Sequence, residues 1–86
     1  MESASVEAYP NPASNFVNFV YAIPLHNENA KIKISTILGA TIAEIAVNDA
    51  NGKKVVNVSD IKDGIYFYSL MVNDKIYYTK KLIIKH

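Results

Sequence analysis

The most regular alternation of hydrophobic and polar positions lies in the C-terminal part of the chain. Residues 61–72 and 75–85 are rich in aromatic and β-branched side chains, and the polar pair Asn73-Asp74 separates them. Asn and Asp tolerate the positive φ angles that a tight hairpin turn needs. This pattern predicts a β-hairpin that ends the chain, with Gly64 at a sharp entry to its first strand.

The alternation also predicts which side chains of the hairpin face the core. With Ser69 facing water, the inward residues of the first strand are Tyr66, Tyr68, Leu70 and Val72. In the second strand the inward residues are Ile76, Tyr78, Leu82 and Ile84, with Lys80 as a single charged exception. The outward residues there are Tyr77, Thr79, Lys81, Ile83 and Lys85. Because an apolar hairpin is not stable alone in water, the remaining chain has to supply a sheet that covers it.

Upstream of the hairpin, the same alternation predicts short strands over residues 6–9, 15–23, 31–35, 40–47 and 54–58. Their inward residues are Val17, Phe19, Tyr21, Ile23, Ile32, Ile34, Val56 and Val58, with Asn18 on the opposite face. Residues 37–47 contain alanines that tolerate a helix, but β-branched residues favour a strand, namely Thr41, Ile42, Ile45 and Val47.

Turn signals separate these predicted strands. They are Pro10-Asn11-Pro12, Pro24 with the polar loop 25–29, residues 37–39 with Gly39, the loop 48–52 with the turn dipeptide Asn51-Gly52, and residues 59–63 with Ile61 at the edge of the core. About seven short strands with regularly spaced turns are typical of an all-β antiparallel sandwich.

Composition and length favour one small globular domain over residues 1–86, with residues 1–5 as a flexible or expression-derived leader. Half of the 86 residues are hydrophobic and the net charge is +1, which does not suggest nucleic-acid binding. There is no cysteine, and no apolar run approaches the roughly 20 residues of a membrane helix. The first residues lack the basic start and apolar run of a signal peptide.

No group of residues suggests catalysis, a cofactor or a metal. His26 lies in a predicted loop and His86 is the last residue, and neither has cysteines or clustered carboxylates to complete a metal site. Asp60 and Asp63 lie in a predicted turn, where we expect them to cap backbone groups. We therefore expect no enzyme activity and no cofactor.

Three aromatic residues fall on the face opposite the predicted core: Phe16, Phe67 and Tyr77. They are candidates for an exposed contact surface. The alternative, that they cover a sheet edge or pack against the N-terminal segment, stays open at this point.

Three parts of the sequence together resemble a known family. The first is residues 9–15 with Pro10, Asn11 and Pro12, and the second is residues 32–39, which end at Gly39. The third combines residues 58–67, which contain Asp63, Gly64 and Tyr66, with the terminal stretch Lys80-Lys81-Leu82-Ile83-Ile84-Lys85. In order and spacing they are similar to the C-terminal sorting domain of type IX secretion (Por secretion system) cargo proteins of the Bacteroidota. The departures are small: Lys62-Asp63 stands where the family often has proline or alanine, and the strand after Gly39 is rich in alanine.

The resemblance implies an immunoglobulin-like sandwich that acts as a secretion signal without chemistry of its own. Such a domain ends a larger cargo protein, directs it through an outer-membrane translocon, and is usually removed by a sortase-like peptidase. The cargo then passes from the periplasm to the cell surface or the medium. The candidate recognition residues are Lys80, Lys81, Leu82, Ile83, Ile84 and Lys85. We expect no nucleic-acid partner and no membrane insertion.

Alternative functions remain: a carbohydrate- or protein-binding accessory module of a secreted enzyme, or an adhesion spacer. A long strand that ends the chain is also expected at a sheet edge, where it can pair with a second copy as a weak homodimer. The spacing of Gly64 and Tyr66 resembles the tyrosine corner of Greek-key sandwiches and predicts that Tyr66 is buried.

Overall fold

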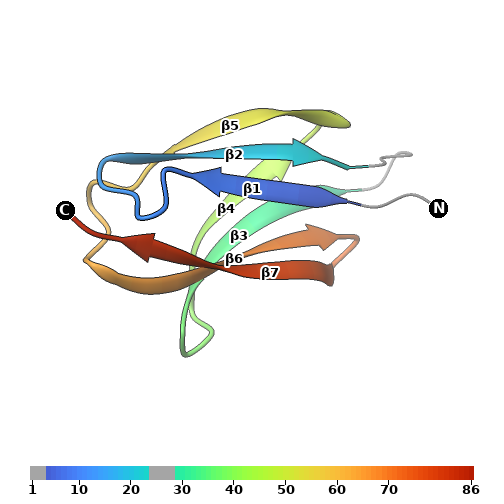
Figure 1. Ribbon diagram of the computed structural model, residues 1–86. Helices are drawn as coiled ribbons and strands as arrows, with labels where there is room; N and C mark the ends of the chain where they lie inside the picture. The colour runs from blue at the N-terminus through green and yellow to red at the C-terminus, as the bar shows by residue number, and fades with distance from the viewer. Residues whose placement is uncertain (1–3, 24–28) are drawn as a thin grey trace.

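The computed structural model describes residues 4–23 and 29–86, and it consists of seven strands in two antiparallel sheets (Figure 1). The strands are β1 (Ser5–Tyr9), β2 (Phe16–Ala22), β3 (Ala30–Thr36), β4 (Thr41–Val47), β5 (Asn51–Asn57), β6 (Gly64–Val72) and β7 (Lys75–Ile84). The predicted all-β sandwich is confirmed. Within the described residues there is no helix that is long and apolar enough to cross a membrane.

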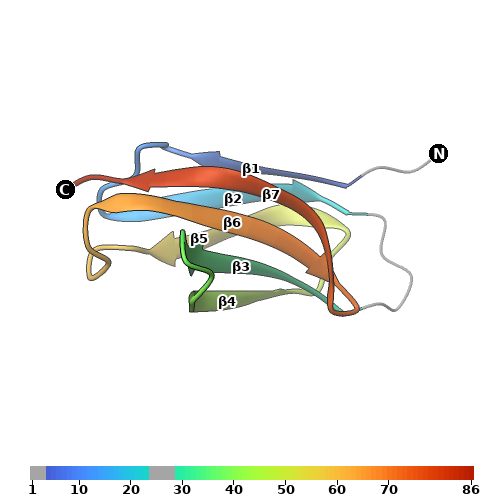
Figure 2. The same cartoon turned by 90° about the horizontal axis from the view of Figure 1, so that it is seen from below.

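The smaller sheet has the strand order β1-β2-β5 and the larger sheet has the order β4-β3-β6-β7. Figure 2 shows the two layers from the side of the larger sheet, with β6 and β7 running the length of the molecule. In constant-type immunoglobulin domains the fourth strand belongs to the sheet of the first, second and fifth strands. Here β4 pairs with β3 instead, so β4 and β7 form the two edges of the larger sheet.

The core fills the space between the two sheets. Its largest fully buried side chains are Phe19, Ile32, Ile34, Leu70, Leu82 and Ile84, with Val6, Val17, Val47 and Val58. The rings of Phe19 and Tyr68 meet across the layers at 5.3 Å between centroids, a tilted contact that joins the two sheets. The predicted inward positions of β2 and β3 are confirmed.

The C-terminal hairpin is confirmed, and so is its turn. Asn73 and Asp74 have φ angles of 52° and 67°, as a two-residue turn between twisted strands requires. Tyr68, Leu70 and Val72 face the core. Ser69 lies on the outer face, as predicted, and its hydroxyl is 3.0 Å from that of Thr79, but the residue is only 4% exposed and is therefore covered rather than open to water.

The predicted inward position of Ile76 is wrong, and a β-bulge is the reason. Leu70 pairs with Tyr78 and Met71 pairs with Ile76, so Tyr77 is an extra residue in β7. One extra residue reverses the faces of every residue on one side of it. Ile76 therefore lies on the outer face and is 59% exposed.

The loop predicted over residues 48–52 is confirmed for residues 48–50 but is wrong for Asn51-Gly52. Both of these residues lie in β5, where they pair with Ala22 and Tyr21 of β2. A Cβ at Gly52 would lie 3.0 Å from the hydroxyl of Tyr21, so a side chain there would require that ring to shift slightly. The strand alternative for residues 41–47 is confirmed over the helix. The predictions for Pro24, for residues 25–28 and for His26 lie outside the described residues.

Candidate recognition surface at the end of the C-terminal strand

The predicted recognition stretch, residues 80–85, forms the second half of β7 at the edge of the larger sheet. Leu82 and Ile84 are almost fully buried in the core. Lys81 and Lys85 are exposed, and Ile83 is half-buried on the outer face. The stretch therefore divides into residues that hold the fold and residues that a partner can reach.

The Pro10-Asn11-Pro12 turn covers the free edge of this part of β7. The Asn11 side chain donates from Nδ2 to the Lys81 carbonyl (3.1 Å), and its Oδ1 accepts from the Ile83 amide (2.9 Å). Ala13 continues the cover as a short parallel bridge: its amide donates to the Ile83 carbonyl and its carbonyl accepts from the Lys85 amide, both at 2.8 Å. The sequence motif thus completes the sheet where β7 would otherwise expose its backbone.

Lys80 is the charged residue among the predicted inward positions of β7, and it links β7 to β1 of the other sheet. Its Nζ lies 3.4 Å from a carboxylate oxygen of Glu7 in β1 and 5.3 Å from the centre of the Tyr78 ring. Interaction with Tyr78, and then with Glu7, raises the pKa of Lys80 above its ordinary value. The Tyr78 hydroxyl also donates to the Val6 carbonyl at 2.9 Å, a second link between β7 and β1.

The loop between β5 and β6 is tied to both Tyr66 and the end of the chain. The Tyr66 hydroxyl donates to the Lys62 carbonyl at 2.7 Å, the kind of backward hydrogen bond that defines a tyrosine corner. Its side chain is only half-buried, so the predicted full burial of Tyr66 is corrected. Asp63 accepts from the His86 amide at 3.0 Å and so binds the last residue of the chain rather than its own turn.

The turn between β3 and β4 exposes two apolar residues that the sequence reading passed over. Leu38 is 94% exposed and Ile37 is 65% exposed. Gly39 has φ of +95°, a left-handed conformation that favours glycine. The signal in the sequence was the pair of large apolar side chains directly before a turn glycine, where polar residues are usual.

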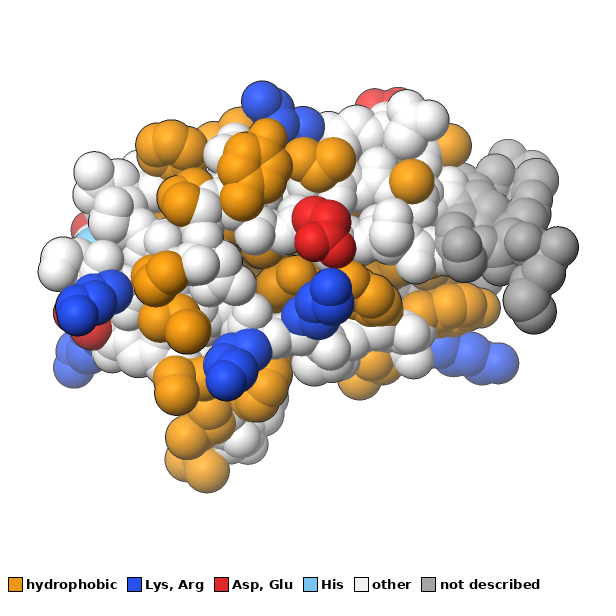
Figure 3. Space-filling view, viewed as in Figure 1, with side chains coloured by type: hydrophobic (Ala, Val, Ile, Leu, Met, Phe, Trp, Pro, Cys, Tyr) orange, Lys and Arg blue, Asp and Glu red, His pale blue; other side chains and the backbone are white. Residues whose placement is uncertain are grey.

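All of the motif stretches meet at this end of the sandwich. Ser35 pairs with Phe67, and Phe67 pairs with Lys81. In the next rows, Thr36 pairs with Tyr66, and Ile65 pairs with Ile83. We call the apolar outer residues of this end the sheet-end patch: Ile37, Leu38, Ile65, Phe67 and Ile83. Figure 3 shows hydrophobic side chains from the protruding turn toward the end of β7, with lysines among them.

The three predicted contact aromatics are not brought together. Phe16 is 49% exposed on β2 of the smaller sheet, whereas Phe67 is half-buried in the sheet-end patch. Tyr77 is 62% exposed at the bulge, near the other end of β7. They therefore form no common platform.

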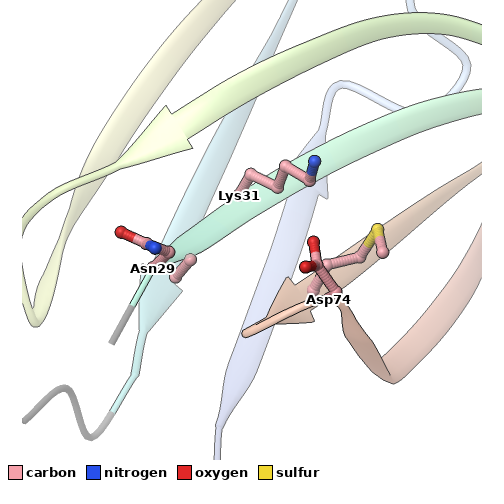
Figure 4. A pocket seen from close by; sticks show the side chains of 5 residues that line it. Asn29, Lys31 and Asp74 are labelled. Atoms are coloured by element: carbon pink, nitrogen blue, oxygen red, sulfur yellow. The ribbon is translucent and has the colours of Figure 1, made fainter. Parts of the chain in front are cut away.

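A pocket of about 220 Å³ lies at the opposite end of the larger sheet, beside the hairpin turn (Figure 4). Asn29, Ala30 and Lys31 line it from β3 and the residue before it, and Met71 and Asp74 line it from the hairpin. The Lys31 ammonium is 3.4 Å from Glu44, and Asn29 and Asn73 hydrogen-bond to each other. Across residues 4–23 and 29–86, no group of His, Cys, Asp and Glu side chains is arranged to hold a metal ion.

Fold and surface together define an immunoglobulin-like β-sandwich whose sequence motifs converge on one end. Residues 7–85 match the family model described as the secretion system C-terminal sorting domain, and the chain belongs to this family. It is a type IX secretion sorting signal, and a domain of this kind is not itself catalytic. The chain is also 33% identical over 82 residues to ulvan lyase NLR42 of Nonlabens ulvanivorans. That match covers 94% of this chain and spans 14% of the length of the lyase.

Proposed function

We propose that this domain carries an attached cargo protein across the outer membrane, and that the export machinery reads it at the end of β7. The observation that carries the proposal is the division of residues 80–85. Leu82 and Ile84 are committed to the core, while Lys81, Ile83 and Lys85 lie on the outer side, with Ile83 as part of the sheet-end patch. Lys80 is exposed as well, but its ammonium group lies 3.4 Å from Glu7. A partner that reads this stretch in the folded domain therefore has these four side chains to contact, and only the first three are free of that ion pair.

The partners that we propose are an outer-membrane translocon and, after passage, a sortase-like peptidase that removes the domain. The cargo would precede residue 1, cross the periplasm and end at the cell surface or in the medium. The match to the lyase covers a small part of that protein, so we propose no activity for the cargo. Pairing of two copies through the β7 edge would be confined to residues 75–80, because the turn at Asn11 and Ala13 occupies the edge beyond them.

The test is export of a reporter fused to the N-terminal side of this chain in a type IX-competent bacterium. We expect Lys81→Ala with Lys85→Ala to lower the amount of secreted reporter while the melting curve stays nearly unchanged. Exposed substitutions of this kind usually change stability by within about 0.5 kcal/mol, whereas loss of charge complementarity slows encounter with a partner. The matched control is Lys53→Ala with Lys75→Ala, which removes two exposed lysines far from the end of β7.

Full secretion by a folded Lys81→Ala, Lys85→Ala variant would show that the partner does not recognise these lysines. The same result with more aggregation would mean that they only protect the edge, as lysines on edge strands commonly do. Equal losses from the control pair would point to a general effect of charge rather than to this end of β7.

A further inference from the structure

The turn between β3 and β4 exposes the apolar side chains of Ile37 and Leu38, and hydrogen bonds fix its backbone. The Thr36 amide donates to the Ala40 carbonyl (2.8 Å), and the Gly39 amide donates to the Thr36 carbonyl (3.0 Å). The Thr36 hydroxyl accepts from the Ala40 amide at 3.1 Å. The exposure of Ile37 and Leu38 therefore belongs to an ordered turn, and binding there costs little loss of backbone freedom.

The fold itself does not need these two side chains to be apolar. The left-handed position of the turn is occupied by Gly39, and neither Ile37 nor Leu38 belongs to the buried core. Polar side chains would serve the turn and favour solubility. Exposed apolar residues that join others on the same face mark an interaction site. Here the turn follows Thr36, which pairs with Tyr66, the neighbour of Ile65 in β6. Ile65 is 52% exposed and pairs with Ile83.

The charges on the β7 side of the sheet-end patch are positive, because Lys81 and Lys85 are exposed there. Two carboxylates lie further out: Asp63 accepts from the His86 amide, and Glu44 lies 3.4 Å from Lys31 and is the cross-strand partner of Lys33. A surface that complements this face offers apolar contact in the centre and carboxylates at the rim.

We infer that the sheet-end patch docks on a protein that presents an apolar pocket bordered by carboxylates, and that Ile37 and Leu38 enter this pocket. The inference rests on the proposed function, because it names the chemistry of the partner that reads the same end of the sandwich. A few well-packed side chains usually carry most of the affinity of such an interface. Leu38, as the most exposed of the apolar residues at this end, is the first candidate for that role.

Two other occupants fit the patch less well. A second copy in two-fold contact would bring two lysine-bearing surfaces together, which is unfavourable. An anionic membrane would attract the lysines, but Ile37 and Leu38 together hold fewer carbons than one myristoyl chain and supply only a small apolar anchor. A single myristoyl chain gives only marginal membrane binding.

The experiment compares export of reporter fusions that carry Ile37→Ser with Leu38→Ser or the matched pair Val55→Ser with Ile76→Ser. Val55 and Ile76 are 61% and 59% exposed, so both pairs remove two exposed apolar side chains, but the control pair lies outside the patch. We expect secretion of the first variant to fall by about tenfold or more, as for loss of central interface residues. The control should be secreted like the parent. Should the double variant melt early, Leu38→Ala replaces it, with the same expected direction.

The outcomes separate this inference from the proposed function. Normal export of a folded Ile37→Ser, Leu38→Ser variant overturns the inference and leaves the sorting function intact. Absence of export for the parent fusion would contradict the proposed function and, with it, the inference that rests on that function. Purified domain is also floated with vesicles of phosphatidylethanolamine and phosphatidylglycerol. Binding to these vesicles that Leu38→Ala abolishes would identify a lipid occupant and overturn the protein partner.

Discussion

The Asn11 side chain supplies hydrogen-bond partners to the backbone of β7 at the edge of the larger sheet. Its amide group replaces two backbone partners that β7 lacks, at Lys81 and Ile83. We expect Asn11→Ala to lower the free energy of unfolding by about 1–2 kcal/mol, because each net hydrogen bond contributes about 0.5–1.5 kcal/mol and water partly replaces it at an exposed edge. Urea unfolding measures the change. Ser14→Ala, an exposed change in the same turn, is the control and should stay within about 0.5 kcal/mol.

Tyr66 contributes both packing and one hydrogen bond to the loop before β6. Tyr66→Phe removes only the bond to the Lys62 carbonyl and should cost about 0.5–1.5 kcal/mol. Tyr66→Ala also removes the ring and should cost about 2–4 kcal/mol, somewhat below the range for fully buried aromatic residues because the ring is half-buried. Thermal melts of the two variants would contradict this account if they coincided with each other.

Tyr68 makes stability depend on pH in the alkaline range. Burial is the main cause that raises the pKa of Tyr68 above 10.0, and Tyr78 adds to it. The folded state therefore favours the neutral phenol. Its contribution is fully present below the pKa of an unfolded tyrosine and is lost as pH rises through the higher folded value.

We expect the thermal midpoint of the parent to fall as pH rises above about 10, and we expect Tyr68→Phe to reduce this fall. The measurement is a series of melts at increasing pH, with Tyr77→Phe as the control because Tyr77 is exposed. If the thermal midpoint of Tyr68→Phe fell at alkaline pH by as much as that of the parent, groups other than Tyr68 would be responsible for the fall.

At the scale of the element, β7 is a regular strand interrupted by one residue. The bulge at Tyr77 lets Ile76 face outward and Tyr78 face inward, each beside its partner in β6. Deletion of Tyr77 should therefore leave every other residue of β7 on its present face and preserve cooperative unfolding. Deletion of Thr79, two positions further on, removes the contact between Thr79 and Ser69 and shifts the pairing between the deletion and the bulge, so that Tyr78 moves from the inner to the outer face.

Urea unfolding of the two deletion variants tests the bulge. We expect the Tyr77 deletion to unfold near the parent, within about 1 kcal/mol, and the Thr79 deletion to be strongly destabilised. Equal destabilisation by both deletions would mean that the bulge itself, through its added twist, is required.

The hairpin also shows what the sequence can and cannot predict. Alternation placed Tyr68, Leu70, Leu82 and Ile84 correctly because inward and outward positions differ in polarity along a strand. It misplaced Ile76 because a bulge leaves no mark in polarity when both neighbours are apolar. Likewise Asn51-Gly52 has the composition of a turn, but pairing with β2 outweighs local preference. The edge cover by Asn11 depends on contacts between distant parts of the chain, which spacing alone does not encode.

At the scale of the whole molecule, the two sheets are joined on their β1–β7 side by polar contacts as well as by the core. The Tyr78 hydroxyl donates to the Val6 carbonyl, and Lys80 lies beside Glu7. The two ends of the domain then carry different features: β1 begins at one end, and the end of β7 presents the outward lysines with the sheet-end patch at the other. Figure 1 shows the start of β1 and the end of β7 at opposite ends of the sandwich. A cargo attached at the N-terminus therefore leaves the end of β7 accessible.

The central claim, that this chain addresses its cargo for export, is tested most directly by secretion of a reporter with and without residues 1–86. The fusions are compared in type IX-competent cells and in otherwise identical cells that lack the translocon. We predict that the reporter reaches the medium or the cell surface only when it carries the domain and the translocon is present. Export without the domain, or equal export in cells without the translocon, would contradict the account.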